Sequence, residues 1–231
     1  MFDCPFIFLT NQFVVITQQS FLYQKGIAII PSPKQANFMK NNFVLGNTII
    51  IVVDKNASQN DQFAAMELLK YFGKVLGESK IVEGSSRKAI HLTRKSVDKK
   101  LGVQEYSLTA PANRLIVRIG GEVGLFYAVQ TSKQLVQKQG SEIFIEGMEI
   151  TDWPDTKIRA AHYDTKYHQD THEFVESFIR DLSKYKVNKL IWEWEDKFAY
   201  PSHPDIGAPR AFTMLLIIML LFMHPLQHFC Y

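Results

Sequence analysis

The chain has 231 residues, enough for one large domain or two smaller ones, and its 46% apolar and 21% charged residues exclude a wholly disordered protein. A net charge of +3, scattered along the sequence, is too small to indicate a nucleic-acid-binding surface. The two cysteines, Cys4 and Cys230, form neither a disulfide framework nor a zinc-finger spacing.

The leader, residues 1–26, has two alternative interpretations. Residues 6–16 are mostly apolar, but polar residues interrupt them and no basic residue precedes them. A secretory signal has basic residues first and then an unbroken apolar run. The segment is therefore either a degraded or mis-started signal peptide or a leader without that role.

Residues 27–150 show the pattern of a mixed α+β domain. An apolar stretch at its start ends at Pro31-Ser32-Pro33. Apolar periodicity, β-branched runs and glycine breaks then predict, in chain order, a strand at 47–54, a helix at 60–76, strands at 89–93, 105–109 and 114–119, a helix at 123–137 and a strand at 143–150. This order predicts one α+β layer that closes near residue 150.

A second pattern begins after Asp152-Trp153-Pro154, a sequence that interrupts regular structure. We expect a strand at 157–164, a helix at 171–186 and a strand at 187–194. A strand–helix–strand unit of this length takes a right-handed parallel crossover. One such unit cannot close its own core, so we expect it to need further chain.

The last part of the sequence, residues 214–231, is an aberrant apolar tail. Residues 214–223 form an unbroken apolar run without a polar face, about half of the roughly 20 residues that a membrane-spanning helix needs. Such a tail is buried, associated with a membrane, prone to aggregation or foreign to the fold. We do not expect it to span a membrane.

Several motifs resemble those of family 20 glycoside hydrolases, the β-N-acetylhexosaminidases. Residues 124–135, G-L-F-Y-A-V-Q-T-S-K-Q-L, are similar to a long helical motif of that family and make the most specific match. Residues 29–34 (I-I-P-S-P-K) and 101–108 (L-G-V-Q-E-Y-S-L) resemble parts of its non-catalytic N-terminal domain.

The second half resembles the start of the family's catalytic barrel. Residues 150–154 (I-T-D-W-P) look like the segment that leads into it, and residues 159–164 look like its first strand, with Ala160 in place of glycine. Residues 185–190 (Y-K-V-N-K-L) fit the second strand. Residues 193–198 (E-W-E-D-K-F) resemble a divergent branch of the family.

The resemblance implies a zincin-like α+β domain at residues 27–151 and an incomplete (β/α)8, or TIM, barrel start at residues 152–213. Family members remove terminal N-acetylhexosamine with retention, using the substrate's acetamido group as nucleophile. An Asp–Glu pair on the fourth barrel strand assists them, and we find no fourth strand in this sequence. We therefore expect a hexosaminidase fragment without catalytic residues that is inactive alone. The alternative is a non-catalytic carbohydrate-binding or unstable fragment, produced by truncation or a frameshift.

The candidate substrate-binding residues are Arg159, Glu195 and Asp196. The resemblance assigns Arg159, at the carboxyl end of the first barrel strand, to adjacent sugar hydroxyls; the residues alone favour a structural ion pair. Asp196 falls where the family has an Asp that supports catalysis, although both acids also fit a solvated loop or a pair with Lys197.

The expected partners are glycans that contain N-acetylhexosamine, not nucleic acid, and no cofactor is expected. Three histidines, among them His172, invite comparison with a metal site. Residues 172–176, H-E-F-V-E, nevertheless lack the second histidine of H-E-x-x-H, so no metal is expected. The resemblance implies that a full-length family member is secreted or periplasmic.

Overall fold

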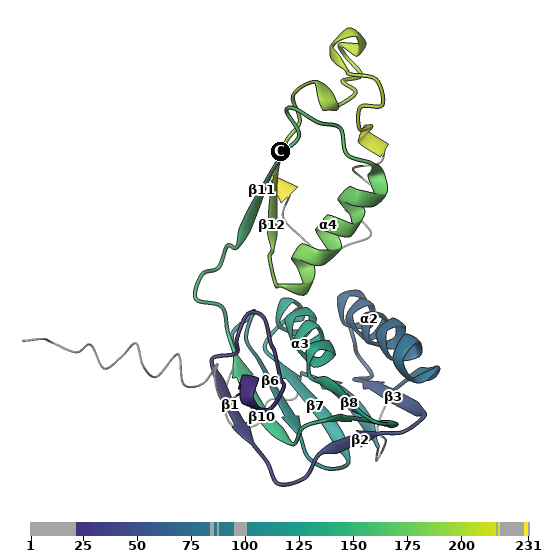
Figure 1. The fold of residues 1–231 in the computed structure, drawn as a ribbon, viewed down its shortest axis with the longest axis vertical. Coiled ribbons are helices and arrows are strands. Elements are labelled where there is room, and N and C mark those ends of the chain that lie inside the picture. The colour runs from purple at the N-terminus through teal and green to yellow at the C-terminus, as the bar shows by residue number, and fades with distance from the viewer. Residues whose placement is uncertain are drawn as a thin grey trace, which may run out of the picture. The chain divides into compact units, whose positions relative to one another are not determined.

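In the computed structural model, shown in Figure 1, the chain forms two compact units, and the boundary lies between Trp153 and Pro154. Most of the leader and most of the apolar tail lie outside the residues that the structure describes. The described residues are 22–83, 86, 88–94, 101–215, 217 and 229–230.

The first unit contains two sheets and two long helices. Seven strands form the main sheet in the order β1-β10-β6-β7-β5-β3-β4, and β2, β9 and β8 form a small antiparallel sheet. The expected α+β class of this unit is confirmed. The elements are β1 (Gln35–Phe38), β2 (Phe43–Leu45), β3 (Thr48–Val53), α2 (Gln59–Leu76), β4 (Glu78–Glu83), β5 (Ala89–Thr93), β6 (Tyr106–Ala110), β7 (Arg114–Ile119), α3 (Glu122–Gln134), β8 (Val136–Gln139), β9 (Glu142–Ile145) and β10 (Met148–Asp152).

The main sheet is mixed, and both helices cover one of its faces (Figure 1). Strand β3 pairs in parallel with β4 and β5, and β5 pairs in parallel with β7, whereas β6 runs antiparallel to β7 and β10. Parallel neighbours need a long connection, and α2 supplies it between β3 and β4. The core between helices and sheet includes the fully buried Phe72, Leu115 and Val129.

Helix α2 begins at a capping box. The Ser58 hydroxyl accepts a hydrogen bond from the Asp61 amide at 3.2 Å, and the Asp61 carboxylate accepts one from the Ser58 amide at 3.1 Å. The buried Asp61 also forms an ion pair with Arg94, in which Nη2 lies 2.8 Å from Oδ1. These contacts tie the start of α2 to the residue that follows β5.

The start of α3 crosses the loop before β6 at very short range. The Gly124 amide donates to the carbonyl of Val103 at 3.1 Å. A Cβ atom at Gly120 would lie 2.2 Å from the Leu101 carbonyl oxygen, and one at Gly124 would lie 2.5 Å from that of Glu105. Gly120 and Gly124 therefore allow two backbone segments to come into contact.

A buried polar network joins α3 to the end of β10. The Tyr106 hydroxyl donates to Asp152 Oδ2 at 2.8 Å and shares a hydrogen bond with Thr131 Oγ1 at 2.7 Å. The Lys34 amide donates to Asp152 Oδ1 at 3.2 Å. Burial and the neighbouring Asp152 carboxylate raise the pKa of Tyr106 well above its usual value, so the phenol keeps its proton.

Several element boundaries differ from those expected. Helix α3 ends earlier, and its expected last residues belong to β8, which pairs with β9. The strand expected at 143–150 is two strands, because β9 belongs to the small sheet and β10 to the main sheet, and between them the Gly147 amide donates to Asn42 Oδ1 at 3.0 Å. Strands β1, β2 and β4 are not predicted, since they are short or charged edge segments.

The second unit contains one parallel strand–helix–strand crossover, as expected. Its strands β11 and β12 are in parallel register, and β13 pairs in parallel with β12. The hydrophobic core between the strands and α4 includes Val175, Ile179 and Leu190. Among the described residues, every helix is too short or too polar to cross a bilayer. The elements are β11 (Ala160–Asp164), α4 (His172–Lys184), β12 (Lys189–Glu193), η1 (Glu195–Lys197), η2 (Pro204–Ile206) and β13 (Phe229–Cys230).

Candidate functional site

The carboxyl ends of β11 and β12 meet at one edge, because the strands are parallel and Asp164 is in register with Glu193. On the exposed face beside it, His162 Nε2 lies 3.1 Å from Glu193 Oε2. Lys166, which follows β11, and Glu195 and Asp196, which follow β12, add further charged side chains to this edge. Since α/β folds place ligands at the carboxyl ends of parallel strands, we take this edge as the candidate site.

The loop that leaves β11 is bound across to the end of β12. The buried Thr165 donates to the Glu193 carbonyl through its hydroxyl at 2.7 Å and through its amide at 3.2 Å. The Lys166 amide donates to Asp164 Oδ1 at 2.8 Å. These bonds fix where the Lys166 side chain leaves the backbone.

An ion pair that sequence reasoning missed joins the two strand ends. Lys166 Nζ lies 2.9 Å from Glu195 Oε1. The hydrogen bond that Lys166 donates to Glu195, together with the negative charge of that carboxylate, raises the pKa of Lys166, so the ammonium group stays protonated. Glu195 has φ of 45°, in the left-handed region that residues other than glycine seldom adopt. The signal in the sequence is weak, because only strand register brings these two residues together.

Asp196 forms the ion pair with Lys197 that the sequence left open as an alternative. Its side chain is 47% exposed, so its carboxylate remains accessible to solvent. The backbone around it is held firmly: the Asp196 carbonyl accepts a hydrogen bond from Ala208 and the Lys197 carbonyl accepts one from Phe212, both at 2.7 Å. Glu195 and Asp196 thus lie together in η1, directly after β12.

The expected place of Arg159 at the carboxyl end of the first strand is wrong. Arg159 precedes β11 and lies at its amino end. Its Nε donates to the Lys186 carbonyl at 2.8 Å and its Nη1 donates to the Thr156 carbonyl at 2.7 Å. The Asn188 side chain accepts from the Arg159 amide at 2.8 Å, the Arg159 carbonyl accepts from the amides of Asn188 and Lys189, and the strand register begins at Ala160.

Asp170 anchors the loop between β11 and α4. It accepts a short hydrogen bond from the Tyr163 hydroxyl and lies 3.0 Å from His168 Nε2. Burial is the main reason why the pKa of Tyr163 is raised. Within the described part of the chain, the buried amide group of Gln169 has no hydrogen-bond partner.

Two tryptophans pack the core behind the charged edge. The rings of Trp192 and Trp194 stack with centroids 3.9 Å apart, and Phe212 contacts both of them. Trp192 is buried, whereas the neighbouring Glu193 is exposed. Core and surface residues therefore alternate along β12.

Two histidines of the second unit pair with separate carboxylates, His162 with Glu193 and His168 with Asp170. Thr171 caps α4 by accepting from the Phe174 amide at 3.2 Å, which places His168 before the helix. Among the residues that the structure describes, no three potential metal ligands gather. This arrangement gives no support to a metal centre.

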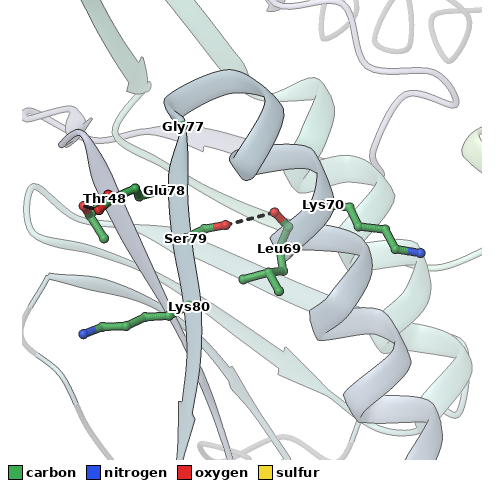
Figure 2. A pocket seen from close by; sticks show the side chains of 7 residues that line it. All are labelled: Thr48, Leu69, Lys70, Gly77, Glu78, Ser79 and Lys80. Carbon is green, nitrogen blue, oxygen red and sulfur yellow. Dashed lines mark hydrogen bonds between the residues drawn. The ribbon is translucent and has the colours of Figure 1, made fainter.

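The first unit has an open hollow where α2 meets β3 and β4 (Figure 2). Its polar groups bind one another: the Ser79 hydroxyl donates to the Leu69 carbonyl at 3.0 Å, and the Thr48 hydroxyl donates to Glu78 at 3.2 Å. Figure 2 shows no side chains converging on its centre. The charged edge of the second unit is the better candidate.

Residues 26–153 match the family model of glycosyl hydrolase family 20, domain 2. A β-hexosaminidase of Porphyromonas gingivalis is 25% identical over 204 residues, which cover 81% of this chain and 26% of that protein. A β-hexosaminidase of Vibrio furnissii is 27% identical over 118 residues, 48% of this chain and 19% of that protein. The chain therefore spans about a quarter of the length of these relatives or less.

Solved structures show the same fold. The family 20 β-N-acetylhexosaminidase of Streptomyces coelicolor matches with a TM-score of 0.72 and 22% identity, over 87% of this chain and 44% of that one. The exo-β-N-acetylglucosaminidase of Vibrio harveyi, solved with N-acetylglucosamine, matches with a TM-score of 0.74 and 16% identity, over 86% and 34%. At these identities the likeness is one of fold.

Proposed function

This chain belongs to glycosyl hydrolase family 20, and we propose that it is part of a β-N-acetylhexosaminidase-type enzyme that binds a terminal N-acetylhexosamine at the carboxyl ends of β11 and β12. The family match and the names of its relatives support the ligand class. The observation that carries the site is the shared edge at the carboxyl ends of β11 and β12, where Lys166 pairs with Glu195 and Lys197 pairs with Asp196. Both carboxylates are acceptors suited to sugar hydroxyls.

The fold is part of the same proposal. We take the first unit to be the zincin-like accessory domain and the β11–α4–β12 unit to begin a (β/α)8 barrel. Exposed Ile191 and Glu193 would then face the barrel interior, since the opposite face of β12 packs on α4.

The chemistry available to these 231 residues is binding rather than cleavage. Substrate-assisted hydrolysis needs a carboxylic acid that protonates the leaving oxygen next to a group that orients the acetamide. The sequence contains no adjacent Asp-Glu pair that would match the family's pattern. We expect no release of nitrophenol from 4-nitrophenyl N-acetyl-β-glucosaminide above a blank, although the sugar binds. Turnover that is abolished by Glu195→Gln would contradict this part of the proposal.

Glu195→Gln and Asp196→Asn should each weaken binding of N-acetylglucosamine about 10-fold, because a charged hydrogen-bond acceptor is worth about 1.5–3 kcal/mol. Isothermal titration calorimetry measures the effect. Glu176→Gln and Asp181→Asn are matched controls, since each removes a carboxylate of an ion pair on α4, the first half-buried and the second exposed. Equal affinities in all five proteins would count against the site.

Arg159 lies at the amino end of β11, opposite the carboxyl edge, and it enters the proposal as a separate saccharide contact whose guanidinium is oriented by two carbonyl groups. Arg159→Lys keeps a cation but loses the fork, so binding should fall about 10-fold. Thermal unfolding of the same variant separates the two roles. A lower melting temperature with unchanged affinity would show that Arg159 only ties the amino ends of β11 and β12 together.

A further inference from the structure

We propose that the outer edge of β11 and the flank of α4 above it form an interface with a second copy of this chain, related by a two-fold axis. A helix packed on two parallel strands leaves one strand edge and one helix flank to be covered by further elements. A second copy brings the same edge and the same flank. The inference does not depend on the saccharide site.

Strand β11 lies at the edge of its sheet. The described strands of the second unit have the order β11-β12-β13, so β12 pairs with one side of β11. The Arg159 carbonyl and the Thr165 amide bond to β12 on that side, at 3.3 and 3.2 Å. Because successive residues of a strand direct their backbone groups to opposite sides, the even positions direct theirs to the open edge. These positions are Ala160, His162 and Asp164.

Helix α4 has an apolar stripe on the flank above β11. Phe174, Phe178 and Leu182 follow one another at intervals of four residues, so they lie along one side of the helix. The Phe178 ring contacts that of Tyr163 on β11, with centroids 5.1 Å apart, which places the stripe on the β11 side. Phe174 is 51% exposed, and its ring stacks on that of Phe178. The stripe therefore extends the apolar surface of α4 beyond the core of its own unit.

One two-fold axis beside β11 brings both features into contact with their equivalents. Antiparallel pairing of two β11 strands, centred on His162, aligns Ala160 of one copy with Asp164 of the other, at a strand spacing of about 4.8 Å. Helix α4 packs over both β11 and β12, since one core contains Tyr163 and Trp192. Its axis therefore lies about one strand spacing from the two-fold axis. The two helices are then about 10 Å apart, the distance at which helices pack.

The exposed face of the two strands is complementary in charge to itself under the same axis. This face carries Lys189 at its amino end and Asp164 and Glu193 at its carboxyl end. Antiparallel pairing places the acidic end of each copy beside the basic end of the other. A strand edge and one helical stripe make a small interface, and small interfaces are typical of weak association. We therefore expect a dimer with a dissociation constant in the micromolar range.

Sedimentation velocity of the full chain, measured with a thiol reductant over a series of micromolar concentrations, tests the interface. Wild type should shift from monomer to dimer as the concentration rises. His162→Pro removes the N–H at the centre of the open edge, where proline is tolerated, and should raise the dissociation constant about 10-fold or more. His162→Ala keeps that N–H and is its matched control. Phe174→Asp should weaken the dimer as much, since it removes an apolar contact from each copy. Ser177→Asp, at an exposed position of α4 outside the stripe, is the second control.

Dimers of wild type and of both controls, with weakened dimers of His162→Pro and Phe174→Asp, are the expected result. A wild type that stays monomeric at every concentration overturns the proposal, as does a dimer that neither substitution weakens. Growth beyond a dimer also contradicts it, because a two-fold interface closes on itself. Melting temperatures that match those of the controls show that weaker association does not come from unfolding. If His162→Pro does not fold, Phe174→Asp decides alone.

Discussion

Gly120→Ala should lower the free energy of unfolding of the first unit by about 3 kcal/mol or more, as overpacking against a rigid neighbour does. The new methyl group would lie 2.2 Å from the Leu101 carbonyl oxygen and 2.3 Å from that of Gly102. Both are backbone atoms and cannot rotate away. Urea unfolding followed by far-UV circular dichroism measures the change.

Gly73→Ala is the matched control for this prediction. Gly73 lies inside α2, and a Cβ atom there would meet nothing closer than the Ser79 hydroxyl at 3.6 Å. Alanine is the better helix former, so this variant should gain roughly 0.5–1 kcal/mol. If Gly120→Ala unfolded at the same urea concentration as wild type, the close crossing between α3 and the loop before β6 would be wrong.

Asp152→Ala should cost about 3 kcal/mol, because it removes a buried carboxylate and deprives its donors of their acceptor. Tyr106 and Lys34 donate to the two oxygens of this carboxylate, which lies at the end of β10. Tyr106→Phe should cost only about 1 kcal/mol, since it removes one hydrogen bond and keeps the ring. Urea unfolding again measures both variants.

The control for Asp152→Ala is Glu149→Ala, which removes an exposed carboxylate from the same strand. It should change the stability by less than about 0.5 kcal/mol. A double-mutant cycle between Tyr106→Phe and Asp152→Asn then isolates the coupling of the pair. A coupling energy near zero would show that the hydrogen bond from Tyr106 on β6 to Asp152 on β10 does not stabilise the sheet.

The regular parts of the fold could be predicted because their residues are buried on one side or on both. Strands β5 and β7 occupy the predicted ranges, since apolar residues alternate along them or fill them. Strand β4 could not be predicted, because its sequence, E-S-K-I-V-E, contains the charged residues of an edge strand and no clear apolar pattern. Its pairing with β3 depends on α2 returning the chain to that edge, which local sequence does not encode.

The site could be predicted in part. The motif at residues 193–198 pointed to Glu195 and Asp196, which the structure places next to each other after β12. Lys166 was missed because its partner lies on another strand and only the register brings them together. Arg159 was misplaced because its position was taken from the resemblance, although the strand predicted at 157–164 already has residue 159 near its amino end, where the structure places it. Hydrophobic periodicity does not reveal hydrogen bonds between side chains and the backbone, or contacts between residues on different strands.

Titration of the full, ¹⁵N-labelled chain with N-acetylglucosamine, followed residue by residue by NMR, tests the saccharide site most directly. Saturable shifts of the amides of Lys166, Glu195 and Asp196, with α2 and the hollow beside it unchanged, are the predicted result. Saturable shifts confined to the first unit, or no saturable shift at millimolar sugar, would contradict a saccharide site at the carboxyl ends of β11 and β12.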